Sequence, residues 1–129
     1  WGARAVPSEN GGFLQVSGLT YEIHTGVASS AEKDENGMFT RVSGEYRVKN
    51  VMVGGQPLEL DKTYTLASHN YMLLGHGDGY TMFDGCEVLG EDMMVDNQVL
   101  ITYITTTLGG VVGEQYANPY GDGRIVAVE

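Results

Sequence analysis

Residues 13–24 read FLQVSGLTYEIH, and this stretch decides the fold because apolar and polar residues alternate on both sides of one glycine. A period of two is typical of a β-strand with one buried face. Gly18 alone is too short a break to turn the chain back as a hairpin. The pattern therefore predicts one long strand with a bulge or kink at Gly18.

Further β-like segments lie on the C-terminal side of this stretch. Strands are expected over residues 39–43, 45–53, 56–60, 63–68, 87–89 and 124–128. The Gly54–Gly55 pair predicts a tight turn, and Pro57 places the strand that follows it at a sheet edge. The last strand is apolar on both faces, so we expect it to be central. Residues 26–38 show no periodicity and are expected to form a flexible acidic loop.

The period changes after residue 90, where apolar side chains recur at helical spacing. They are Val95, Val99, Leu100, Tyr103, Ile104 and Leu108. Asp92 or Asp96 can serve as the N-cap, and Gly109–Gly110 ends the helix. We expect this helix to cover one face of a mixed sheet of about six or seven strands. The predicted fold class is α+β with one main C-terminal helix, in a single domain over residues 1–129.

Charge and hydropathy exclude several classes of function. The 129 residues carry a formal net charge of −10, from 17 acidic and 7 basic side chains, and the basic ones are scattered. Nucleic-acid binding needs clustered cations, so no nucleic-acid polymer is expected as a partner. No apolar run is long enough to span a bilayer, so we expect no membrane insertion by this chain. The chain opens at Trp1 without an initiator methionine, which indicates a fragment of a longer polypeptide.

The single cysteine, Cys86, cannot form an internal disulfide. It lies between Asp84 and Glu87, whose negative charge opposes a reactive thiolate. We therefore expect Cys86 to be a small buried apolar residue rather than a nucleophile.

Residues 70–80 (NYMLLGHGDGY) are the strongest candidate for a ligand site. Glycines at this density allow positive φ and close approach of the backbone to a ligand. The carboxylate of Asp78 is placed to accept two hydrogen bonds from a sugar diol, as acidic residues do in dinucleotide folds. Tyr71 and Tyr80 flank the loop and could stack on a planar base. An ordinary connection in which Asp78 caps a turn is the alternative, because short glycine motifs are weak evidence.

Other kinds of site find less support in the sequence. No Gly-Lys-Ser/Thr follows the glycines, which excludes a P-loop, and the acidic spacing does not match an EF-hand. His24, His69 and His76 lack the spacing of zinc ligands, and no metal site is predicted. His24 and His69 are interpreted as structural, and His76 as the one histidine that could face a ligand. No Gly-x-Ser-x-Gly motif or Ser-His-Asp set points to a catalytic residue.

Four blocks together resemble the C-terminal domain of the 5′-nucleotidase family. They are GGFLQVSGLTYEI (11–23), VMVGGQPLELDKTYTLASHNYM (51–72), GHGDGYTMF (75–83) and GDGRI (121–125), in the order of the family. The resemblance implies a bimodular enzyme whose N-terminal metallophosphatase domain holds two divalent metal ions. That domain, and the upstream part of the C-terminal domain, are expected to lie outside this chain. It also implies an extracellular, cell-surface or periplasmic location.

The resemblance assigns roles to individual residues. Phe13, which the residues alone would place in the core, matches the first of two rings that sandwich the base. Asp78 matches the aspartate that binds the ribose hydroxyls, between Gly77 and Gly79. Tyr71, after Asn70, matches the second ring. Position 76 is His where the family commonly has glycine, and the spacing from Tyr71 to Asp78 is one residue longer, so His76 also borders the expected pocket.

Two functions follow from this interpretation. The first is the nucleotide- or nucleoside-recognition portion of a 5′-nucleotidase-like phosphohydrolase in nucleotide catabolism. Its cofactors and catalytic residues would lie in the metallophosphatase domain, so this chain alone would be inactive. The alternative is a non-catalytic binding or surface-interaction module that keeps the fold without the nucleotide pocket. Arg4 does not match the family's phosphate-holding positions, so the cations for the phosphate would come from elsewhere.

Overall fold

The computed structural model describes all residues from 1 to 129 and divides them into two compact units. Trp1–Asp84 together with Gly123–Glu129 form one, here called the sheet unit. Gly85–Asp122 form the other, here called the helix unit. The two are described separately below.

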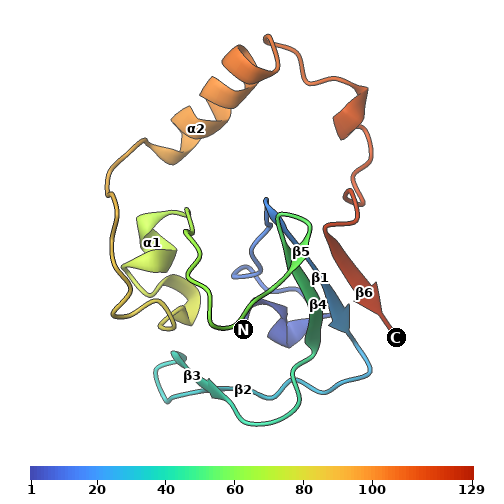
Figure 1. Cartoon of the computed structure of the whole chain (residues 1–129), viewed down its shortest axis with the longest axis vertical. Helices are drawn as coiled ribbons and strands as arrows, with labels where there is room; N and C mark the ends of the chain where they lie inside the picture. The colour runs from blue at the N-terminus through green and yellow to red at the C-terminus, as the bar shows by residue number, and fades with distance from the viewer. The chain divides into compact units, whose positions relative to one another are not determined.

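A four-stranded mixed sheet is the centre of the sheet unit (Figure 1). Its order is β5-β4-β1-β6, with β1 at Leu19–His24, β4 at Val48–Val53, β5 at Gln56–Pro57 and β6 at Ile125–Val128. Neighbouring strands are antiparallel except for β1 and β6, which are parallel. A mixed sheet combined with a few helices makes the fold α+β, as the sequence predicts.

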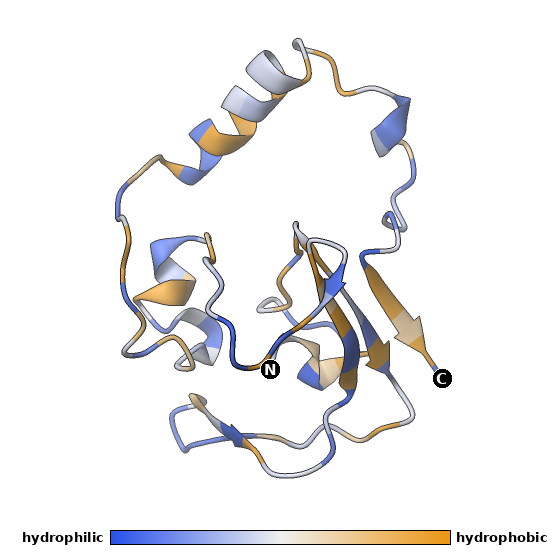
Figure 2. Ribbon diagram, viewed as in Figure 1, coloured by the Kyte–Doolittle hydropathy of each residue, from blue (hydrophilic) through white to orange (hydrophobic).

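The core of the sheet unit is small. Figure 2 shows apolar residues along β1, β4 and β6, and Ile23 on β1 is only 2% exposed. The other buried side chains are Ala3, from the N-terminal segment, and Met72 and Tyr80, from the glycine-rich segment. Burial of these residues stabilises the unit, because each removes apolar area from water.

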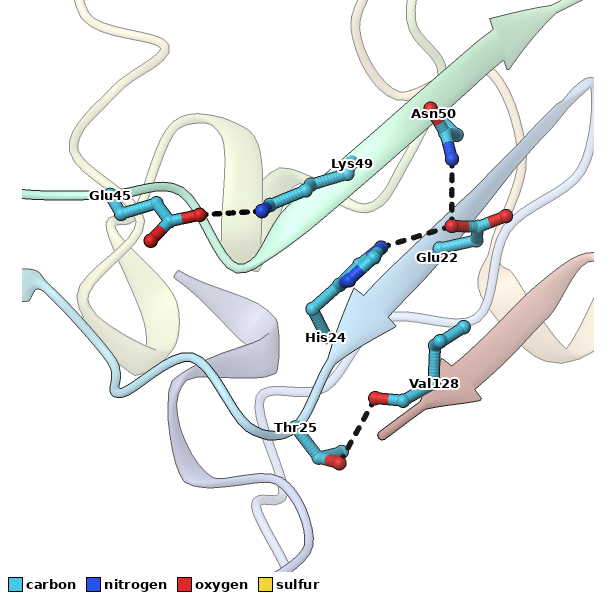
Figure 3. Close-up of polar contacts among 7 residues, drawn as sticks. All are labelled: Glu22, His24, Thr25, Glu45, Lys49, Asn50 and Val128. Atoms are coloured by element: carbon cyan, nitrogen blue, oxygen red, sulfur yellow. Dashed lines mark hydrogen bonds and ion pairs between the residues drawn. The ribbon is translucent and has the colours of Figure 1, made fainter.

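The pairing of β1 with β4 contains a bulge at Asn50. The register shifts between Thr20 and Glu22, and Asn50 adopts a positive φ of 51°, which asparagine tolerates better than most residues. In Figure 3 the Asn50 amide points to the Glu22 carboxylate and donates to it at 2.7 Å, while His24 Nε2 lies 3.0 Å from the same oxygen. These bonds, that of Asn50 first, lower the pKa of Glu22. His24 therefore has the structural partner that the sequence predicts.

Residues 13–17 are not a strand, which corrects the prediction of one long strand across Gly18. The reason is the length of the partner. Leu19 pairs with Val53, the last residue of β4, and the Gly54–Gly55 turn follows at once. No backbone of β4 remains to pair with residues 13–17, so their alternating pattern has no ladder to join.

The remaining strand predictions are partly wrong. Residues 63–68 and 87–89 form no strand, and β6 is an edge strand rather than a central one. β2 at Ala31–Lys33 lies inside the predicted acidic loop and pairs with β3 at Phe39–Val42 in a separate two-stranded sheet. A hairpin partner supplies hydrogen bonds that local composition does not reveal, which is why the loop prediction failed.

Arg47 fixes the N-terminal segment to the sheet. Its Nη1 donates to the carbonyls of Ala3, Arg4 and Val6 at 3.1, 3.3 and 2.9 Å, at the end of the 3-10 turn Gly2–Ala5. Carbonyls at a helical end have no partner within the helix, and a guanidinium can satisfy several of them at once. The sequence placed Arg47 in a predicted strand and gave no signal for this role.

In the helix unit, α2 spans Asp96–Thr102 and continues as a π-helical turn over Tyr103–Thr107. Gly109 and Gly110 end it with φ of 65° and 84°, as predicted. The N-cap is Val95, without a side-chain hydrogen bond, so neither predicted aspartate caps the helix. No residue of α2 is buried, and no helix in the structure has the length and apolarity needed to cross a bilayer.

Cys86, the residue expected to be buried, is exposed. It belongs to the helix unit, in which no residue is buried. The prediction rested on the usual burial of free cysteine, and it is wrong here because the helix unit has no core to receive the side chain.

Candidate functional site

The glycine-rich segment forms a short helix followed by a tight turn. α1 spans Asn70–Leu73, and a 3-10 turn follows at Gly77–Gly79. His76 and Asp78 adopt φ of 55° and 53°, in the left-handed region that non-glycine residues rarely enter. Asp78 is one of the residue types that tolerate it, because a short polar side chain can bond locally. The Asp78 side chain is consequently held on an unusual local backbone and is exposed.

Tyr71 lies directly against this turn. A Cβ built on Gly77 would meet three atoms of the Tyr71 ring at 2.2, 2.4 and 2.5 Å, so only glycine permits the ring to sit there. Tyr71 is nevertheless 56% exposed. The loop therefore supports an aromatic ring that still has surface available for another molecule.

Gly12 joins the glycine-rich turn to the segment that contains Phe13. A Cβ on Gly12 would lie 2.8 Å from the Cβ of Asp78 and 3.5 Å from its Oδ2. The Tyr80 hydroxyl donates to the Gly12 carbonyl at 2.6 Å, across 68 positions of sequence. The residue beside Phe13 is thus in contact with Asp78, as the resemblance requires of a shared site.

Phe13 is half-buried rather than a core residue. It lines an open pocket of about 400 Å³ together with Val6, Ser8, Glu9, Asn10 and Gly11. Its ring contacts neither the Tyr71 ring nor another aromatic ring, whereas Trp1 and Phe39, and Tyr80 and Phe83, form ring pairs. The Gly12 backbone, next to Phe13, therefore lies beside Asp78, while the Phe13 ring remains partly exposed.

Trp1 also contacts the Asp78 turn, and the sequence did not predict this contact. Its indole Nε1 donates to the Asp78 carbonyl at 2.9 Å, and its ring would lie 3.0 Å from a Cβ on Gly79. The Arg4 guanidinium sits 3.7 Å from the centroid of the same ring. No motif or spacing points to Trp1, because the residue it contacts is 77 positions away.

Tyr80 does not flank the loop as an exposed stacking ring, which corrects that part of the prediction. It is 6% exposed and stacks on Phe83 with centroids 6.3 Å apart. Burial raises the pKa of its phenol, and the Asp78 charge acts in the same direction, while Arg4 acts against it. The hydroxyl therefore keeps its proton and remains a donor to Gly12.

The His76 side chain pairs with the acidic residue Asp84. Its Nε2 lies 2.6 Å from Oδ1 of Asp84, in an exposed pair. No group of three or more His, Cys, Asp and Glu side chains in this chain is arranged to hold a metal ion. Of the residues assigned from the sequence, Asp78, Gly77, Gly79 and Tyr71 gather at one turn, and Asn70 begins the helix before it.

Comparison with known proteins supports the resemblance found in the sequence. Residues 4–85 match the model of a family described as 5′-nucleotidase, C-terminal domain. Protein UshA of Yersinia enterocolitica serotype O:8 / biotype 1B is 42% identical over 57 residues. Those residues are 44% of this chain but only 10% of that relative, so the match spans about a tenth of its length. No solved structure matches the chain. The matched region covers most of the sheet unit, and the chain belongs to the 5′-nucleotidase C-terminal domain family.

Proposed function

We propose that this chain recognises the nucleoside part of a nucleotide for a 5′-nucleotidase-like phosphohydrolase. The observation that supports this most is the contact of Gly12 with the Asp78 side chain, where a Cβ would be 2.8 Å away. It brings together two segments that the family resemblance assigns to one ligand. Membership of the 5′-nucleotidase C-terminal domain family supports a nucleotidase-associated role.

In this proposal Phe13 and Tyr71 stack on the two faces of the base. Both side chains have accessible surface, and Tyr71 is supported from behind by Gly77. Aromatic rings stack on any base, and each such contact stabilises a complex by about 1–3 kcal/mol. Ring stacking would supply affinity without strong selectivity among bases.

Asp78 reads the ribose. Its carboxylate is exposed, and a carboxylate can accept hydrogen bonds from both hydroxyls of a vicinal diol. Gly77 and Gly79 let the backbone of the turn come close to the sugar, and Asn70 and His76 border the same turn. In this proposal the left-handed conformation of Asp78 directs its carboxylate toward the sugar.

Hydrolysis belongs to another part of the enzyme. We propose that a metallophosphatase domain outside these 129 residues performs it with two divalent metal ions, and that this domain is the chain's partner. The enzyme would act outside the cell, at its surface or in the periplasm, in nucleotide catabolism. The chain itself offers no candidate metal cluster.

Calorimetric titration of adenosine and AMP into the chain tests the recognition role. Phe13→Ala and Tyr71→Ala should each weaken adenosine binding by roughly 5- to 150-fold, from the stacking energy above. Asp78→Asn should weaken adenosine but not a nucleoside lacking both ribose hydroxyls. Tyr46→Ala removes an aromatic ring that is 65% exposed elsewhere in the sheet unit, and should leave affinity unchanged.

Two results would overturn the proposal. If none of the three changes weakens binding, the chain is the non-catalytic module that keeps the fold without the pocket. If the chain with divalent metal releases phosphate rapidly from AMP, hydrolysis does not require the separate domain.

His76, which pairs with Asp84, is the residue that departs most from the family pattern. If the chain does not bind adenosine because the imidazole blocks the pocket, His76→Gly should restore binding.

A further inference from the structure

Two long-range hydrogen bonds from aromatic side chains hold the Asp78 turn and the Gly12 backbone beside it. The Trp1 indole donates to the Asp78 carbonyl at 2.9 Å, and the Tyr80 hydroxyl donates to the Gly12 carbonyl at 2.6 Å. The first fixes the residue that carries the carboxylate. The second fixes the backbone against which that carboxylate lies.

Both donors are suited to hold position. Tyr80 is buried and its raised pKa keeps the hydroxyl protonated, so the bond to Gly12 persists over the physiological pH range. The Trp1 ring is fixed by Arg4 above it and by the edge of Phe39, with centroids 5.6 Å apart. Arg47 in turn binds the carbonyls of the turn that follows Trp1.

A left-handed aspartate needs such support. Asp78 at φ 53° is held in a sparsely populated conformation, which is retained only when the surroundings determine it. An exposed side chain supplies little of that support itself. Two backbone bonds close the turn around Asp78, from Gly79 N–H to the His76 carbonyl at 2.9 Å and from Tyr80 N–H to the Gly77 carbonyl at 3.3 Å. The bond from Trp1 and the close backbone of Gly12 add contacts to Asp78 itself.

We infer that Trp1 and Tyr80 are positioning residues that aim the Asp78 carboxylate at the ribose hydroxyls, acting through the Asp78 carbonyl and through Gly12. This inference rests on the proposed function, since it concerns the same carboxylate. It makes the tryptophan at position 1 and the buried tyrosine part of specificity for ribose, although neither touches the nucleoside.

The test compares two ligands, adenosine and 2′,3′-dideoxyadenosine, by calorimetric titration into the chain. Trp1→Phe and Tyr80→Phe keep the rings and remove one donor each. Each should weaken adenosine binding on the order of fivefold, which corresponds to the net free energy of one hydrogen bond. Each should leave the affinity for dideoxyadenosine unchanged. Tyr46→Phe is the matched control and should change neither ligand. Circular dichroism shows whether each variant is folded.

Each outcome decides something. If Trp1→Phe and Tyr80→Phe weaken both ligands equally, the two residues are only structural and the inference is overturned, while the proposed function stands. If Asp78→Asn weakens adenosine and dideoxyadenosine equally, Asp78 does not bind the ribose hydroxyls, and the proposed function is wrong whatever Trp1 and Tyr80 do. Should Tyr80→Phe not fold, Trp1→Phe decides the inference, because Trp1 donates directly to the Asp78 carbonyl.

Discussion

The sheet unit and the helix unit differ in how their apolar residues are used. The sheet unit contains every buried side chain of the molecule, among them Ile23 and Tyr80. The helix unit has none, although α2 carries Val99, Leu100 and Ile101. Both stretches show clear periodicity in the sequence. The difference teaches that periodicity identifies an element and its apolar face, but does not identify what covers that face.

Long-range polar contacts show the same difference. In the sheet unit, Arg47, Trp1 and Tyr80 each bond to backbone tens of residues away. In the helix unit the hydroxyls of Tyr103 and Tyr116 lie 2.9 Å apart and link positions only 13 residues apart. A unit with few tertiary contacts is expected to open more readily than one with a core.

Paired substitutions in the two units should give the largest difference. Ile23→Ala removes a side chain that is 2% exposed and should cost about 2–5 kcal/mol of unfolding free energy. Val99→Ala, at a site 54% exposed, should change it by less than about 0.5 kcal/mol. Denaturant unfolding measures both, with Trp1 fluorescence reporting on the sheet unit, which holds the only tryptophan, and circular dichroism reporting on α2. Equal costs would show that α2 is covered in the folded protein and would remove the distinction between the units.

The elements that the sequence predicts well are those whose pairing is short-range or whose period is strong. β1, β3 and the edge strand β5 follow from alternation and from the Gly54–Gly55 turn, and α2 follows from its helical period. Residues 13–17 and 63–68 have the same composition as strands but no neighbouring backbone to pair with. Strand formation depends on that neighbour, which lies elsewhere in the sequence.

The glycine-rich turn of the candidate site was predictable from the sequence, and the contacts that hold this turn were not. The turn with Asp78 and the neighbouring Tyr71 follow from glycine density and from the family resemblance. Trp1 and the inward position of Tyr80 do not, because each depends on a contact 68 or 77 positions away. Whether Phe13 and Tyr71 bind a base is a matter for titration, and remains a prediction.

Two glycines with similar positive φ allow a second comparison between the units. Gly79 and Gly110 have φ of 81° and 84°, so alanine is strained at both by about 1–2 kcal/mol. At Gly79 a Cβ would also lie 2.5 Å from the Gly37 carbonyl oxygen, whereas Gly110 has nothing within 4 Å. Gly79→Ala should therefore lower the thermal midpoint more than Gly110→Ala, as measured by circular dichroism. Equal shifts would mean that the Asp78 turn is as loosely packed as the end of α2.

Low pH should destabilise the sheet unit through protonation of Glu22, and this is the smallest of the three stability effects predicted for the two units. The bonds from Asn50 and His24 lower the pKa of Glu22 below its usual 4.5 in the folded state. A depressed folded pKa means that this contribution to stability is complete above about pH 4.5 and is lost as the pH falls through the lowered value.

Glu22→Gln should consequently flatten the decline of unfolding free energy below that pH, because its side chain no longer takes up a proton. Glu35→Gln removes one negative charge from an exposed turn and controls for the change in net charge. Denaturant unfolding at a series of acid pH values measures both variants. If the two flatten the curve equally, then general charge, and not the Glu22 hydrogen bonds at the Asn50 bulge, sets the acid sensitivity of the sheet.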